Sequence, residues 1–203
     1  MLKKFVFFAI NGYMKFYKII FFLFLITNAH SNDEFKLRKI TDLNNPWSMT
    51  FLNNEEILIS DKEGQIQNIN LKNKIINKIN HNLNYKVDGQ GGLLEILKHK
   101  DSIYLCYTED RGSGKTSTSI AKAKFTKNNL NFKNIFQANP PINSGYHYGC
   151  RMVIQDDKYL YASVGERGGG NIAQDFNQHP GSIIKINLDG SVPKDNPRFK
   201  GKP

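Results

Sequence analysis

Alternating apolar and polar residues recur along the chain in short runs, which are separated by turns rich in Asn, Asp, Lys and Gly. A period of two with such turns between the runs is typical of antiparallel β-strands. The runs form three successive units of the same order, because their inner segments align as MTFL, LLEI and RMVI, then ILIS, IYLC and LYAS, then IQNINL, IAKAKF and IIKINL. Strands are expected at 35–43, then at 47–52, 57–60, 65–71 and 74–79, at 92–97, 103–108, 117–125 and 130–137, and at 150–154, 159–164 and 182–188.

This repetition predicts an all-β fold of a particular type. Phe51, Ile96 and Ile154 hold equivalent places, so the repeat period is 45–58 residues. Repeats of this size, each a four-stranded antiparallel meander, are typical of a β-propeller, whose blades stack because one blade cannot bury both of its faces. We expect about three blades of an incomplete propeller, since a closed ring has about four to eight. A β-sandwich is the alternative, although it does not require such regular repetition.

The N-terminal segment predicts export. Lys15 and Lys18 precede an apolar run at 19–26 that is too short to span a bilayer comfortably, which is typical of a secretory signal peptide. Small residues at Ala29 and Ser31 predict a signal peptide at 1–31 and a mature domain at 32–203. We therefore expect a periplasmic or secreted protein without a stable membrane anchor after cleavage. Met14 is a second possible start of translation, and an uncleaved anchor is the alternative.

Charge and cysteine content add two expectations. The formal charge of +10 includes four lysines of the leader, so residues 32–203 hold 24 basic and 18 acidic side chains. The six surplus charges are scattered among Asn-rich turns, which favours solubility and argues against a nucleic-acid partner. Export permits a disulfide between Cys106 and Cys150, whereas their apolar strand patterns are equally compatible with two buried thiols.

The chain offers a pair of residues suited to acid–base chemistry. The runs at 151–154 and 159–164 predict a β-hairpin, with His147 just before its first strand and Glu166 just after its second. Antiparallel pairing places both residues at the same end of the hairpin. An imidazole oriented by a carboxylate is a minimal general base. The alternative is a His and a Glu on a solvated loop end.

The propeller interpretation gathers further polar residues at one place. The first strand of each blade lines the central channel, so the residues just before these strands, at 46–47, 89–91 and 146–148, should converge at one mouth. Trp47, Gln90 and His147 would then surround one opening, which is typical of a ligand site. The glycines beside Gln90 would let the backbone approach a ligand closely. Arg151 either reaches the channel or pairs with a carboxylate.

Five motifs occur along the chain: DGQGGLL at 88–94, YHYGCR at 146–151, ASVGER at 162–167, AQD at 173–175 and GSIIKINLDGSVPKDNP at 181–197. Together they resemble the soluble quinoprotein glucose/sorbosone dehydrogenase family, in particular its aldose sugar dehydrogenases. The resemblance implies a six-bladed propeller that holds pyrroloquinoline quinone (PQQ) and calcium at the channel mouth. It also implies oxidation of the C1 hydroxyl of an aldose to a lactone, with a sugar and an electron acceptor as partners.

The resemblance also implies roles for individual residues. By position, His147 matches the family's catalytic base, Glu166 the carboxylate that orients it, and Gln90 a glutamine of the sugar site. Cys150 departs from the family's usual Gly or Ser. The family's later segment, which carries an Arg-Asn pair for the cofactor and the calcium ligands, has no counterpart here, so we expect a truncated chain that is inactive alone. A non-catalytic propeller that binds a ligand is the alternative function, and a propeller lactonase would want more metal ligands around the axis.

Overall fold

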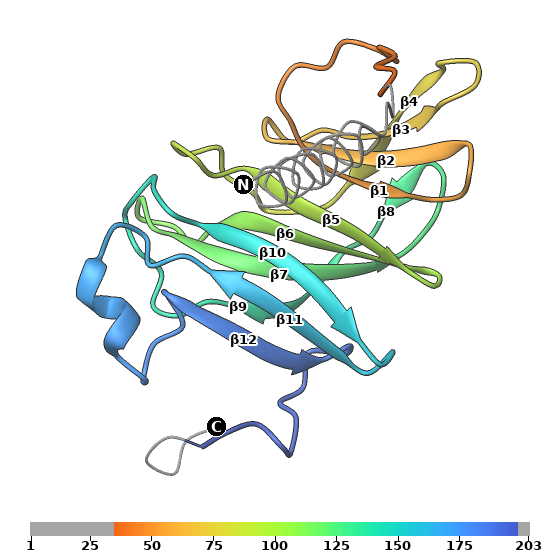
Figure 1. The fold of residues 1–203 in the computed structure, drawn as a ribbon. Helices are drawn as coiled ribbons and strands as arrows, with labels where there is room; N and C mark the ends of the chain where they lie inside the picture. The colour runs from red at the N-terminus through yellow and green to blue at the C-terminus, as the bar shows by residue number, and fades with distance from the viewer. Residues whose placement is uncertain (1–34, 199–203) are drawn as a thin grey trace, which may run out of the picture. The chain divides into compact units, whose positions relative to one another are not determined.

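The computed structural model describes residues 35–198, and the chain divides into units at 1–39 and 40–203. The second unit is all-β, as the alternation predicts: its described part consists of three sheets and one short 3-10 helix at Gly170–Gln174 (Figure 1). No sheet among the described residues closes on itself. The predicted signal peptide at 1–31 lies outside the described residues. Within 35–198, no helix is long and apolar enough to cross a membrane.

The three sheets follow one another in sequence order, except that β8 of the first sheet lies in the chain between β7 and β9 of the second. The first has the strand order β1-β2-β3-β4-β8, the second β5-β6-β7-β9 and the third β10-β11-β12. Neighbouring strands pair antiparallel, except for the parallel pair β4 and β8. The strands are β1 Pro46–Phe51, β2 Glu56–Asp61, β3 Ile66–Asn70, β4 Ile76–His81, β5 Leu93–His99, β6 Ser102–Asp110, β7 Thr116–Lys124, β8 Asn129–Leu130, β9 Lys133–Gln137, β10 Gly149–Gln155, β11 Tyr159–Val164 and β12 Ser182–Asn187.

The sheets stack face to face through apolar cores. Strand β5, at one edge of the second sheet, contacts both β1 and β10, the corresponding edge strands of the other two sheets. Successive residues of a strand point to opposite faces, so Leu105 in β6 enters the core between the first and second sheets, whereas Tyr104 enters the core between the second and third. Both faces of the middle sheet are therefore buried, which explains why seven of the nine residues of β6 are buried.

Two predicted strands are wrong in informative ways. Residues 35–43 form no strand: Phe35 and Leu37 are 93% and 99% exposed, and Ile40 and Leu43 instead pack as single side chains on an apolar cluster of the first sheet. Alternation alone does not make a strand, because a strand also needs a neighbour to pair with.

The second wrong prediction is the single strand at 130–137. It divides into β8, which pairs with β4 of the first sheet, and β9, which pairs with β7 of the second. Between them, the backbone N–H of Phe132 donates to Oδ1 of Asn82 at 2.8 Å, and Nδ2 of Asn82 donates to the Phe132 carbonyl at 3.1 Å. These bonds hold the chain where it crosses from one sheet to the next.

The two cysteines form a disulfide, which decides between the alternatives that the sequence leaves open. Cys106 lies in β6 and Cys150 in β10, at a sequence separation of 44. Both side chains are buried in the core between the second and third sheets. The bond therefore connects the hairpin β10–β11 covalently to the middle sheet.

Candidate active site

The hairpin brings His147 and Glu166 together, as the sequence predicts. Strands β10 and β11 pair antiparallel from Gln155 opposite Tyr159 to Gly149 opposite Val164, with one shift of register between Met152 and Gly149. The residues that flank the open end of the hairpin are therefore neighbours, and Nδ1 of His147 is hydrogen-bonded to Oε1 of Glu166. The His147 side chain is 52% exposed and that of Glu166 is 29% exposed. The pair is thus accessible to a ligand from solvent.

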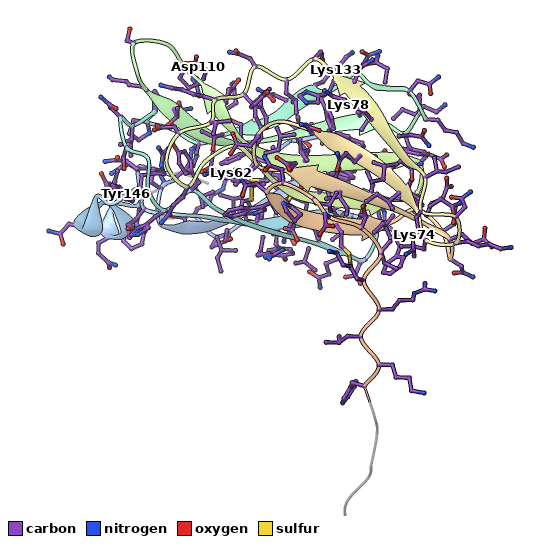
Figure 2. All side chains as sticks on the ribbon, turned by 90° about the horizontal axis from the view of Figure 1, so that it is seen from above. Lys62, Lys74, Lys78, Asp110, Lys133 and Tyr146 are labelled. Carbon is purple, nitrogen blue, oxygen red and sulfur yellow. A yellow bond between two sulfur atoms is a disulfide. The ribbon has the colours of Figure 1, made fainter. Side chains whose placement is uncertain are left out.

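The site lies at one end of the stacked sheets. Figure 2 shows Tyr146, the neighbour of His147, at the end that carries the 3-10 helix, and Lys74 at the opposite end. The ends of β10 and β11 and the turn before β5 supply the site residues. An end formed by loops on a rigid sheet scaffold is a common place for binding and catalytic residues.

The backbone of His147 is held on both sides. Its N–H donates to Oε1 of Gln90 at 2.9 Å, and its carbonyl accepts from the backbone N–H of Arg167 at 3.3 Å. Its φ of 48° lies in the left-handed region, which is uncommon for a residue with a side chain. A Cβ atom on Gly165 would lie 1.8 Å from the His147 carbonyl oxygen, so only glycine fits there.

Gln90 is close to His147, and a glycine beside it lets two loops approach each other. The Gln90 N–H donates to the Gly145 carbonyl at 2.8 Å. A Cβ atom on Gly89, whose φ is 56°, would lie 2.4 Å from that same oxygen. The glycine therefore lets the loop of Gln90 approach the loop that carries His147, rather than only a ligand.

The electrostatics of the pair favour one tautomer of the imidazole. The hydrogen bond with His147 lowers the pKa of the Glu166 carboxyl, and the backbone N–H of Gly168 contributes in the same direction. Glu166 is therefore ionised at neutral pH and can only accept hydrogen bonds. The proton of a neutral His147 must then lie on Nδ1, which leaves the lone pair of Nε2 to take a proton from a bound molecule.

Trp47 and Arg151 belong to a different group of contacts. Trp47 lines a hollow of about 370 Å³ together with Glu95 and Arg151. Nη1 of Arg151 lies 3.4 Å from Oε1 of Glu95, and the Met152 N–H donates to the other oxygen. Of the two alternatives for Arg151, the structure has the pairing with a carboxylate. Burial raises the pKa of Glu95, against the opposing effects of these two partners.

Arg167 is not among the site residues predicted from the sequence, yet its side chain is one of the most buried charged groups among the described residues. Only 3% of it is exposed, and its guanidinium contacts backbone carbonyls of the loop before His147. The one signal in the sequence is its position beside Glu166 in the ASVGER motif. Within residues 35–198, no group of three or more His, Cys, Asp or Glu side chains could hold a metal ion.

Comparison with known proteins places this geometry in a family. The family model described as glucose/sorbosone dehydrogenase matches residues 43–203. The chain belongs to the glucose/sorbosone dehydrogenase family. Aldose sugar dehydrogenase YliI of Escherichia coli is 27% identical over 167 residues, which are 78% of this chain and 45% of that protein.

Solved structures of sugar dehydrogenases have the same fold. A glucose dehydrogenase crystal structure matches with a TM-score of 0.76 and 28% identity, over 82% of this chain and 52% of that one. The PQQ-bound form of aldose sugar dehydrogenase from Streptomyces coelicolor matches with a TM-score of 0.69 and 26% identity, over 82% of this chain and 52% of that one. The chain thus spans about half the length of these relatives.

Proposed function

We propose that this chain is part of a PQQ-dependent aldose dehydrogenase, which oxidises the anomeric C1 hydroxyl of an aldose to a lactone. The observation that carries the proposal is the hydrogen bond between His147 and the ionised Glu166 at an accessible hairpin end. Homologues that are named aldose sugar dehydrogenase, and a structural neighbour with PQQ bound, support the substrate class and the cofactor.

In this proposal His147 is the general base. Oxidation at C1 requires that the hydroxyl proton leave, and Nε2 of His147 is the nitrogen available to take it. The carboxylate of Glu166 keeps the ring in the required orientation and stabilises the imidazolium that forms. Because Oε1 of Gln90 accepts from the His147 backbone, the amide nitrogen of Gln90 is the group that donates to a sugar hydroxyl.

The described residues do not by themselves fit the cofactor or calcium. PQQ carries carboxylates, which need cationic or hydrogen-bond-donating partners. The guanidinium of Arg167 bonds inward to backbone carbonyls, and Arg151 pairs with Glu95. We therefore assign the binding of PQQ and calcium to the half of the family's length that this chain does not span.

The proposal extends to the architecture and the location. We assign the three stacked sheets to three blades of a six-bladed propeller, and the polypeptide alone to an inactive part of the enzyme. The leader at 1–31 directs the protein to the periplasm or outside the cell, where a separate electron acceptor takes up the electrons. Stacking of β1, β5 and β10 side by side supports the blade assignment.

Calorimetry tests this proposal. PQQ with calcium would be titrated into the chain and into a version that is extended by any in-frame coding sequence downstream, and both would be assayed for aldose-dependent dye reduction. We expect binding and dye reduction by the extended version alone. Saturable sugar binding without dye reduction by either version would instead support the alternative of a non-catalytic binding module.

A further inference from the structure

We propose that Arg167 is a positioning residue for the base His147, whose guanidinium holds the loop 144–147 in place from inside the protein. The inference rests on the proposed function for its catalytic meaning, whereas the contacts stand without it. It concerns a residue that neither touches the expected sugar nor belongs to the His147–Glu166 pair.

The side chain of Arg167 ties two segments together. Nε donates to the Tyr146 carbonyl at 3.0 Å, and Nη2 donates to the Ser144 carbonyl. On the other side, Nη1 donates to the Thr116 carbonyl at 3.0 Å, and Nη2 donates to Oγ1 of Thr116 at 2.8 Å. Thr116 is the first residue of β7. The loop that leads into His147 is thus fastened to the middle sheet.

The main chain of Arg167 acts on the same residue. Its N–H donates to the His147 carbonyl, and the residue before it is Glu166. Arg167 therefore bonds to the carbonyls of both Tyr146 and His147. Through the adjacent peptide bond it also holds Glu166, whose carboxylate is hydrogen-bonded to Nδ1 of His147. A displacement of Arg167 would move both partners of the pair relative to each other.

The surroundings of the Arg167 guanidinium favour a planar group at this position. The guanidinium lies over the ring of Tyr148, 3.6 Å from the centroid. The Tyr148 hydroxyl contacts Oγ1 of Thr116 at 2.9 Å and Oδ2 of Asp88 at 3.2 Å. Arg167 thus reaches the carboxylate of Asp88 only through this hydroxyl, and its direct acceptors are carbonyls and a hydroxyl.

Burial of the charged Arg167 guanidinium costs desolvation free energy. Burial lowers the pKa of the Arg167 guanidinium, with Tyr148 and Asp88 acting in the opposite direction. An apolar side chain would fill the site without this desolvation cost, but it would leave the Tyr146 carbonyl without its donor and the Ser144 carbonyl with the Tyr148 hydroxyl alone. Arginine offers a planar set of five N–H donors, whereas lysine offers one ammonium group. The geometry therefore points to positioning of the loop rather than to charge alone.

The test compares Arg167→Lys, which keeps the charge, and Arg167→Met with the unchanged chain. Carbon-13 NMR would follow the carboxyl of Glu166 during a pH titration, because its pKa is lowered chiefly by the contact with His147, and Arg167 is not among the causes. We expect both variants to raise the pKa of Glu166 towards its ordinary value. Arg111→Lys is the matched control: the Arg111 guanidinium bonds to Ser117 at 3.2 Å and lies 3.9 Å from Glu109, neither of which contacts His147 or Glu166, so its substitution should leave the pKa of Glu166 unchanged.

Circular dichroism would establish that each variant is folded. Should the Arg167 variants fail to fold, Thr116→Val removes one acceptor of the guanidinium and keeps the charge, and we expect a smaller shift of Glu166 in the same direction. In the extended, PQQ-loaded protein, Arg167→Lys should lower kcat about tenfold to a hundredfold, because a misplaced base loses its reactive geometry, and should change KM little.

An unchanged Glu166 titration in a folded Arg167→Lys or Thr116→Val variant would overturn the positioning role. A different result would refute the proposed function. Sugar oxidation that survives His147→Ala would refute the role of the base, and the shift of Glu166 in the Arg167 variants would still support the positioning of the loop.

Discussion

Reduction of the Cys106–Cys150 disulfide is expected to lower the free energy of unfolding by about 4 kcal/mol. The bond closes a loop of 44 residues, and a loop of that length removes about 13 cal/mol/K of chain entropy from the unfolded state. Both cysteines are buried in the core between the second and third sheets. Reduction removes the covalent constraint but leaves nearly all atoms in place, so the packing of that core changes little.

The assay is urea unfolding of the oxidised and the reduced chain, followed by circular dichroism and by the fluorescence of Trp47, the one tryptophan. With an m-value of about 2 kcal/mol/M, the midpoint should fall by about 2 M urea on reduction. The control is the double variant Cys106→Ala/Cys150→Ala, whose midpoint should not respond to reductant. A shift of the unchanged chain by less than about 0.5 M would refute the reasoning that this bond constrains the unfolded state.

Three further predictions follow from the site. Gly165→Ala places a Cβ atom against the His147 carbonyl, so unfolding experiments should show a loss of about 1–3 kcal/mol; an unchanged midpoint would contradict the close approach. The pKa of Glu166 is lowered in the folded protein, so the contribution of Glu166 to stability is present above its ordinary pKa of 4.5. This contribution is lost as the pH falls through the pKa of the folded state. Urea midpoints at several pH values should show that this part of the pH dependence vanishes in Glu166→Gln. Gln90→Ala removes the acceptor of the His147 N–H and a donor for the sugar, so steady-state kinetics of the loaded enzyme should show a higher KM and a lower kcat; a change in neither would remove Gln90 from the site.

Much of the fold follows from the alternation of side chains. The run at 159–164 becomes β11, in which every second residue is buried, because a strand on a stacked sheet turns alternate side chains towards the core. The same geometry explains why the hairpin argument places His147 beside Glu166. Neither inference needs long-range information, since both partners lie within one hairpin.

Other features depend on contacts that no local pattern encodes. Arg167 follows a glutamate and precedes a run of glycines, a context that favours an exposed loop, yet it is buried because carbonyls at Ser144 and Thr116 receive its donors. The division of 130–137 depends on Asn82, fifty residues earlier in the sequence. The strand expected at 35–43 lacks a pairing partner.

If His147 is the base of a sugar oxidation, its removal must slow the reaction without weakening the binding of the cofactor. Aldose-dependent dye reduction would be measured for the extended, PQQ-loaded protein with and without His147→Ala, together with PQQ binding by calorimetry. Loss of a general base predicts a fall in kcat of about a hundredfold to ten-thousandfold, with PQQ binding unchanged. A variant that binds PQQ and oxidises the sugar at the full rate would contradict the assignment.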